Sequence, residues 1–321
     1  MPATLLLCSL LGCSSPSATP RATPPIEVDP ADRCAKVRAS VVEAGFGDRV
    51  TVTCTDERVT LASDTYPDHT LMTGITGTNE QIPVPGDWAP FLPLVPRGTD
   101  GRTSNDAAVG VAVNGVPIYD YTKQGDLQVD SYNPADDTVA QGELDICNGH
   151  AGRGDDYHYH ASPDCMMAVM NNRGDDAIIG WGLDGYPLYG QNNPDGSPIA
   201  PGDLDVCHGQ PDETFGYRYH TSTGPPYIIQ CLVGEVDVGA IPKVSPLSAA
   251  SGWGEKPAGT PPAGGVTGLV HTREEGGRRS MTYSYRGRDY HISYAPTERE
   301  GCYDFDMDTV SMGVVTSEYC R

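Results

Sequence analysis

The stretch GVAVNGVPIY at residues 110–119 returns in altered form as GWGLDGYPLY at residues 180–189. Each copy sets Asn-Gly or Asp-Gly between two short apolar runs. Such dipeptides favour a tight hairpin, because both turn positions readily take positive φ. We therefore predict a strand, a turn and a returning strand in each copy.

Two further blocks follow these hairpins in the same order. LDICNGH at residues 144–150 matches LDVCHGQ at 204–210, and YHYH at 157–160 matches YRYH at 217–220. Three matched blocks in one order indicate an internal repeat. We predict two related β units, at about residues 110–165 and 180–231, within one domain that spans residues 29–239.

The rest of the chain is typical of a mostly β protein with long loops, because short alternating runs are separated by Gly, Pro, Asn and Asp. The N-terminal part adds an α+β element: Asp29 and Pro30 form a helix start, followed by strands near residues 49–54 and 58–62. Residues 240–264 have the composition of a linker. Residues 265–321 are predicted to form a small C-terminal β unit, with a strand pair at 280–286 and 290–294.

The N-terminal residues indicate export. Residues 1–12 form a short apolar segment that is typical of a signal peptide and too short to span a bilayer. Leu10-Leu11-Gly12-Cys13 resembles a bacterial lipobox, which implies lipidation of Cys13, although no Lys or Arg precedes the apolar run. The alternatives are an ordinary secretory signal or a mere apolar terminus. Residues 13–28, rich in Ser, Thr and Pro, are predicted to be a tether.

The cysteines agree with an extracytoplasmic or secreted protein. Outside the predicted N-terminal segment, an even number remains, which favours disulfides in an exported chain. Local spacing predicts Cys34–Cys54 and Cys302–Cys320, and the repeat then leaves Cys147–Cys165 and Cys207–Cys231. Cys147 near His150 also imitates a catalytic thiol with its base, but the disulfide is the favoured interpretation.

The formal net charge of −22 excludes whole classes of partner. A nucleic-acid-binding protein needs a basic surface to meet phosphates, and so does a protein that grips anionic lipid electrostatically. Membrane attachment is therefore expected only through the lipid at Cys13. The excess of carboxylates favours solubility and attracts cations.

The matched blocks resemble the YHYH domain family. The resemblance rests on Pro67-Asp68-His69, on Asn114 to Tyr119, on Cys147 to His150 and on Tyr157 to His160. It extends through Gly185-Tyr186-Pro187 and YRYH to Pro226 to Cys231, so that it covers roughly residues 50–235. It implies an extracytoplasmic domain and assigns no activity.

The YHYH strand carries the candidate chemistry. Side chains alternate along a strand, so His158 and His160 share one face, and Tyr157 and Tyr159 share the other. Two imidazoles on one face can bind one copper or zinc ion. His150 is the predicted third ligand. His69, by family position, and His220, which matches His160, are candidates to complete the shell.

Alternatives to the metal hypothesis stay open at this stage. The second copy has Gln210 in place of His150 and Arg218 in place of His158, so it has lost two ligands. The histidines are therefore either metal ligands, buried structural side chains bonded to a carbonyl or to Asp145 or Asp205, or acid–base groups. A binding module that grips a carbohydrate, peptide or protein partner with exposed Tyr and Trp181 is a second function. A metal-dependent hydrolase or oxidase is a third.

Overall fold

The computed structural model describes residues 29–79, 81–104, 107–123, 127–152, 156–242, 262–300 and 302–320. The predicted signal segment, the tether with Cys13, and most of the predicted linker (243–261) lie outside these described residues. Within the described part, none of the helices has the length and apolar character that crossing a membrane requires.

The predicted fold class is confirmed: strands make up 35% of the structure and helices 9%. The helical elements are α1 (Pro30–Glu43), α2 (Asp164–Val169) and the 3-10 turn η1 (Glu275–Gly277). The first thirteen strands are β1 (Thr51–Cys54), β2 (Arg58–Ala62), β3 (Phe91–Pro93), β4 (Gly98–Thr103), β5 (Gly110–Ala112), β6 (Pro117–Ile118), β7 (Gly149–Ala151), β8 (Tyr157–Tyr159), β9 (Gly180–Gly182), β10 (Pro187–Tyr189), β11 (Gly209–Asp212), β12 (Gly216–His220) and β13 (Leu232–Gly234). The C-terminal strands are β14 (Thr267–Arg273), β15 (Arg279–Tyr285), β16 (Arg288–Pro296), β17 (Cys302–Thr309) and β18 (Gly313–Cys320).

An eight-stranded sheet forms the centre of the molecule, in the order β11-β12-β10-β9-β5-β6-β8-β7. This order is symmetric about its centre. From the centre outward, each half consists of an antiparallel hairpin, then a strand parallel to the outer strand of that hairpin, then an antiparallel edge strand. The halves meet where β5 pairs antiparallel with β9, through Val111 and Trp181. Both faces are covered, because every residue of β5, β6, β8, β9 and β10 is buried.

The two hairpin turns are where we predicted them, but their geometry differs from the prediction. Only Gly115 (φ 82°) and Gly185 (φ 87°) take positive φ, whereas Asn114 and Asp184 do not. The N–H of Gly115 donates to the carbonyl of Ala112 at 2.8 Å, which closes a four-residue turn whose last residue is the glycine. This is a three-residue loop in which the glycine alone takes the left-handed position, and such a loop needs no positive φ at the residue before it.

The N-terminal helix packs against this sheet. The Asp29 carboxylate accepts from the N–H of Ala31 at 2.8 Å and caps α1, as the sequence predicted. The helix buries Val37 and Val41 in the core, and its Ser40 hydroxyl accepts from the indole N–H of Trp181 at 3.0 Å. Trp181 is fully buried, so it is not the exposed ligand-gripping residue that the binding-module hypothesis required.

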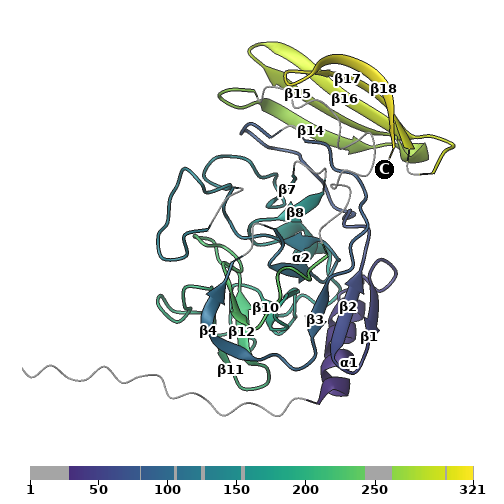
Figure 1. The fold of residues 1–321 in the computed structure, drawn as a ribbon. Helices are drawn as coiled ribbons and strands as arrows, with labels where there is room; N and C mark the ends of the chain where they lie inside the picture. The colour runs from purple at the N-terminus through teal and green to yellow at the C-terminus, as the bar shows by residue number, and fades with distance from the viewer. Residues whose placement is uncertain are drawn as a thin grey trace, which may run out of the picture.

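The C-terminal unit is a five-stranded antiparallel sheet, in the order β14-β15-β16-β17-β18. Figure 1 shows it at one end of the molecule, beyond β7 and β8. It packs on the segment of residues 66–84: Gly74 donates to the Leu269 carbonyl at 2.9 Å, and the Tyr294 hydroxyl donates to the Pro83 carbonyl. Its apolar side chains belong to the same buried cluster as the central sheet, so the unit is an integral part of the fold.

Disulfides close the loops of the fold. Cys34–Cys54 joins α1 to β1, Cys147–Cys165 joins the turn before β7 to α2, and Cys207–Cys231 joins the turn before β11 to the segment before β13. Cys302 is disulfide-bonded and lies opposite Cys320 in the register of β17 and β18.

His271 on β14 should make the junction with the C-terminal sheet sensitive to acid. Burial, with the positive charges of Arg273 and Arg279, lowers the pKa of His271 to about 4. An unfolded histidine takes up a proton near pH 6.5. The contribution of neutral His271 to the free energy of unfolding is therefore complete above pH 6.5 and is lost as the pH falls toward 4. Between pH 7 and pH 4, the parent should lose about 3 kcal/mol more unfolding free energy than His271→Gln, measured by urea titration. Equal losses in the two proteins would contradict this.

Candidate metal centre

Three imidazole rings converge at the edge of the central sheet. His150 on β7 lies opposite His158 on β8, and His160 follows directly after β8 on the same side. The ring centroids are 4.9 Å apart for His150–His158 and 4.8 Å apart for each pair that includes His160. One ring nitrogen from each residue lies within 4.8 Å of the other two. The structure thus brings together the three ligands predicted first.

The Nδ1 atoms of His158 and His160 face groups that accept hydrogen bonds. Nδ1 of His160 donates to the backbone carbonyl of Asp120, and Nδ1 of His158 lies 3.1 Å from the carbonyl and 3.2 Å from the carboxylate of Asp156. A carbonyl oxygen only accepts, so the hydrogen of each ring must sit on Nδ1. Each Nε2 is therefore left with a lone pair.

Nδ1 of His150 also lies beside a backbone carbonyl, 2.9 Å from the oxygen of Glu143, but its second neighbour is a donor, so its contacts do not select one tautomer. The amide nitrogen of Asn79 lies 2.8 Å from that Nδ1 and also donates to the Ala151 carbonyl at 3.1 Å. The Nε2 atoms of His150 and His160 are 3.2 Å apart. One proton between them would satisfy this pair, but no described residue donates to Nε2 of His158.

Burial strongly disfavours positive charge on His150 and His160. It lowers the pKa of His150 to about 3, and the neighbouring His158 adds to this effect. Burial, with His158 and His150 nearby, also lowers the pKa of His160 well below its usual value. His150 and His160 are therefore neutral near pH 7, which is the state in which imidazole binds a metal.

The second half of the sheet places different side chains at the corresponding positions. His220 keeps the geometry of His160, because its Nδ1 lies 2.9 Å from the carbonyl of Gly190. Its Nε2 accepts from Nε of Arg218 at 2.9 Å and lies 3.2 Å from the amide nitrogen of Gln210. Arg218 in turn pairs with Asp212 at 2.6 Å. A protein cation thus occupies the position that faces the imidazole lone pair, and His220 does not join the three-histidine group.

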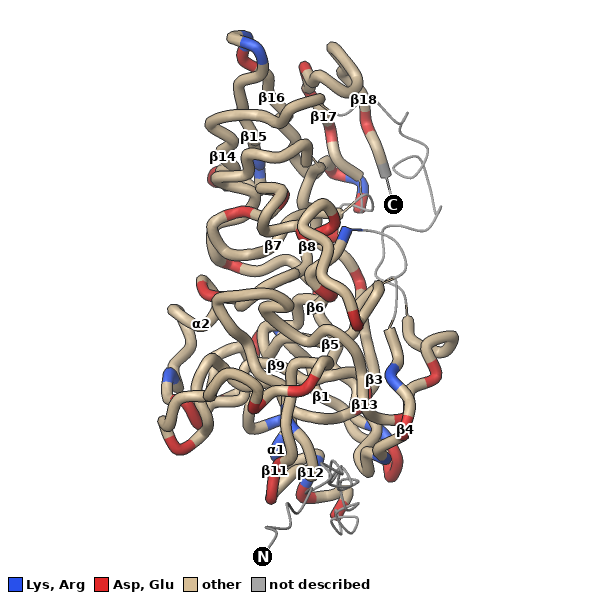
Figure 2. Tube along the Cα trace, turned by 90° about the vertical axis from the view of Figure 1, so that its left-hand side faces the viewer, with Lys and Arg blue, Asp and Glu red and all other residues tan. Residues whose placement is uncertain are grey.

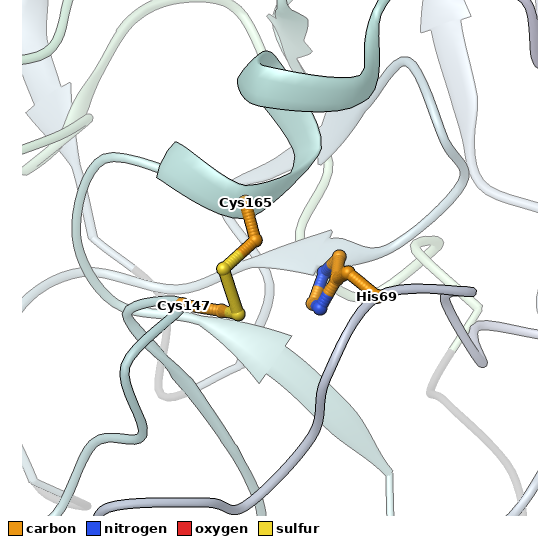
Figure 3. Close-up of side chains that lie close together, drawn as sticks. All are labelled: His69, Cys147 and Cys165. Carbon is orange, nitrogen blue, oxygen red and sulfur yellow. A yellow bond between two sulfur atoms is a disulfide. The ribbon is translucent and has the colours of Figure 1, made fainter.

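His69 also lies outside that group. Its Nε2 is 2.6 Å from the Tyr159 hydroxyl, on the opposite face of β8, and its Nδ1 is 2.7 Å from the Thr70 carbonyl. Figure 3 shows its ring beside the Cys147–Cys165 disulfide. Cys147 is not a free catalytic thiol in this structure, because its sulfur is bonded to that of Cys165.

Asp145 organises the turn that carries His150. Its carboxylate, 4% exposed, accepts from the N–H groups of Met72 (2.7 Å), Cys147 (2.9 Å) and Gly149 (3.1 Å), and from the Tyr157 hydroxyl (2.9 Å). Burial raises its pKa to about 7, although these donors oppose the rise. Asp205 makes the corresponding bonds to Cys207, Gly209 and Tyr217. We considered both residues as histidine partners, but they bind tyrosine hydroxyls instead.

Asp156 and Tyr119 support the site and were not singled out from the sequence. The Tyr119 ring stacks on His158 with 4.0 Å between the centroids, and its hydroxyl donates to the Asp156 carboxylate at 3.4 Å. These contacts restrain the His158 ring from one side and at its Nδ1. Tyr119 is the last residue of the first repeated block, but nothing in that block indicates a contact with histidine.

Acidic residues dominate the charge along the described molecule. Figure 2 shows acidic residues over the whole length of the described molecule, whereas basic residues occur at scattered points.

Comparison with known proteins places the site within a family. Residues 91–201 match the family model described as YHYH protein. The chain contains a YHYH domain. No curated protein and no solved structure matches the chain. The match includes all three converging histidines of the YHYH domain. It ends before Gln210, Arg218 and His220, and it begins after His69, so it is shorter than the resemblance we traced.

Removing the Asp145 carboxylate should destabilise the YHYH domain more than the same change at Asp205. Asp145→Ala leaves a buried tyrosine hydroxyl and three N–H groups without their acceptor, so we expect a loss of about 3 kcal/mol in unfolding free energy. Asp205 is exposed and water can replace it, so Asp205→Ala should cost about 1 kcal/mol. Denaturant titration of both variants measures the difference. A cost at Asp145 no larger than at Asp205 would show that the buried network is unimportant.

Proposed function

We propose that the YHYH domain binds one transition-metal ion, copper or zinc, through Nε2 of His150, His158 and His160. The convergence of these three imidazoles carries the proposal. A single proton shared by His150 and His160 satisfies one pair of ring nitrogens, whereas a cation satisfies all three at once. In tetrahedral zinc sites, two imidazole nitrogens lie about 3.3 Å apart, close to the 3.2 Å between Nε2 of His150 and His160.

The restraints on the far ring nitrogens also support a metal. Metal-binding histidines usually donate their other ring N–H to a carbonyl or carboxylate, which sets the tautomer and aims the ligand nitrogen. Asp120, Glu143 and Asp156 supply such acceptors here. Zinc and copper both accept imidazole nitrogen, and the residues do not discriminate between them.

The second half of the sheet also supports a cation beside the imidazole lone pair. We propose that the halves derive from one repeated unit, in which Gln210 and Arg218 have replaced two ligands. Where those ligands are gone, the remaining imidazole is bonded to a guanidinium. The site thus receives positive charge in both halves, from an ion in the first and from Arg218 in the second.

The setting of the site is proposed to be extracytoplasmic. Three disulfides agree with an oxidising compartment, and the N-terminal segment is proposed to be a signal peptide whose Cys13 carries a lipid. The domain would then bind its metal at the outer surface of a membrane. Three protein ligands also leave room for water or substrate, so metal-dependent hydrolysis or oxidation is a further role of the same site.

A binding module is the second candidate function, and a small hollow favours it. Tyr121, Tyr132, Pro225 and Pro226 are among the residues that line a cavity of ≈ 180 Å³. Tyr132 is 50% exposed and stacks on Tyr121, with 5.9 Å between the ring centroids. Aromatic faces of this kind suit a sugar ring. In this alternative, the histidines are structural, so the metal measurement below separates the two functions.

Metal content should follow the three converging histidines. Elemental mass spectrometry of the purified protein should find one copper or zinc per chain, and His158→Ala/His160→Ala should remove it. His220→Ala and His69→Ala are matched controls that should keep the metal, because neither ring joins the group. Absence of metal from the parent, even after reconstitution with either ion, would refute the proposal.

Restoring the two replaced ligands should create a second site. In Gln210→His/Arg218→His, three imidazoles occupy the positions that His150, His158 and His160 occupy in the first half. We expect the bound metal to rise from one to two per chain, measured by elemental analysis of protein that is folded by circular dichroism. Gln210→His alone keeps the Arg218 cation and should bind one. A folded double variant with a single metal would show that the halves are not equivalent in this respect.

A further inference from the structure

A second group of metal-ligating atoms lies on the other face of β8. A ring nitrogen of His69 and the sulfur atoms of Cys147 and Cys165 are all within 4.8 Å of one another. In Figure 3, the imidazole projects from a segment that runs beside the disulfide, while the two cysteines come from a turn and from α2. Three separate parts of the chain therefore present soft or borderline ligands to one small volume.

In the oxidised state, this group does not bind a metal. A disulfide sulfur is a poor ligand, since the thiolate is the form that coordinates. Reduction changes this. Two external thiols form a disulfide with each other and deliver two electrons and two protons, which converts Cys147 and Cys165 to thiols. Both thiols lose their protons to solvent when a metal binds.

An external thiol has access to the bond from one side. Cys147 is fully buried, but Cys165 is partly exposed at the start of α2. The residues around it present apolar surface, since Ile146 is 62% and Val169 56% exposed. Attack at the sulfur of Cys165 releases Cys147 as the thiolate, on the buried side of the bond.

His69 has the tautomer that such a site requires. Its Nδ1 faces the Thr70 carbonyl, so the hydrogen is on Nδ1 and the lone pair is on Nε2. That lone pair now accepts from the Tyr159 hydroxyl, so the ring must turn toward the sulfur atoms for Nε2 to bind a metal there. A metal would replace one hydrogen bond with a coordinate bond, while the Tyr159 oxygen still accepts from the amide of Asn114 at 3.0 Å.

The second half of the sheet has no equivalent arrangement in the part that the structure describes. The hydroxyl of Tyr219, which corresponds to Tyr159, donates to the Asp184 carboxylate at 2.7 Å. The group of His69, Cys147 and Cys165 thus belongs to the first half alone. It is not explained as a by-product of the repeated geometry.

We propose that reduction of Cys147–Cys165 creates a metal site of two thiolates and the His69 imidazole, selective for a thiophilic ion such as Zn²⁺. Two cysteines and one histidine with an open fourth position are a known zinc ligand set. The ion would bind in reducing conditions and be released on reoxidation. This proposal does not depend on the three-histidine site.

The test uses full-length protein with His158→Ala/His160→Ala, so that the first proposed site is absent. Co²⁺ is the probe, because thiolate coordination gives a sulfur-to-cobalt charge-transfer band. After reduction with a phosphine and its removal, we expect one Co²⁺ per chain and that band, and neither in the oxidised protein. Adding Cys147→Ser/Cys165→Ser should abolish the band, although the other cysteines remain. Adding His69→Ala should weaken binding roughly tenfold or more.

Two results would overturn the proposal. An equal band in the Cys147→Ser/Cys165→Ser protein would assign the thiolates to other cysteines. Reduced protein that unfolds and is not refolded by Co²⁺ or Zn²⁺ would also count against it, because ions that bind the folded site must stabilise it. Circular dichroism with and without metal distinguishes that result from simple binding.

Discussion

The hydrogen bond from Nδ1 of His160 to the carbonyl of Asp120 is the constraint on which the candidate site depends. It joins the end of β8 to the chain that leaves β6, its parallel neighbour in the sheet. Because the carbonyl only accepts, the bond settles both the rotation of the ring and the position of its hydrogen. The opposite nitrogen is thereby turned toward His150. The same bond recurs between His220 and Gly190, where Gln210 and Arg218 stand in place of His150 and His158.

Most of the fold follows from local patterns in the sequence. Alternation, Asn-Gly and Asp-Gly turns and the Asp29 cap are short-range signals, and each produced the element it indicated. The exception was the turn type, since the type I geometry with a glycine at its end uses the same dipeptide as the predicted turn. The packing of the C-terminal sheet on residues 66–84 was not predictable, because contacts so distant along the chain leave no local pattern.

The candidate site was predictable only in part, for a related reason. The period of a strand places His158 and His160 on one face, and the register of β7 and β8 adds His150. The acceptors that orient these rings include backbone carbonyls of Asp120 and Glu143, whose side chains carry no signal for this role. His69 illustrates the opposite case. Its neighbours in the sequence match the family, yet its ring lies on the tyrosine face of β8, a placement decided by the tertiary path of residues 66–79.

A buried cation also needs balancing charge, and the structure offers it at one position. Three neutral imidazoles leave the full charge of an ion uncompensated, which is costly in a protein interior. The Asp156 carboxylate, 4% exposed, contacts Nδ1 of His158 and can offset that charge through the ring. In the second half, Asp212 does this directly, by pairing with Arg218. In the second half, Arg218 lies between the imidazole lone pair and the carboxylate, whereas in the first half the carboxylate lies behind the His158 ring, where it would offset the charge of the proposed ion.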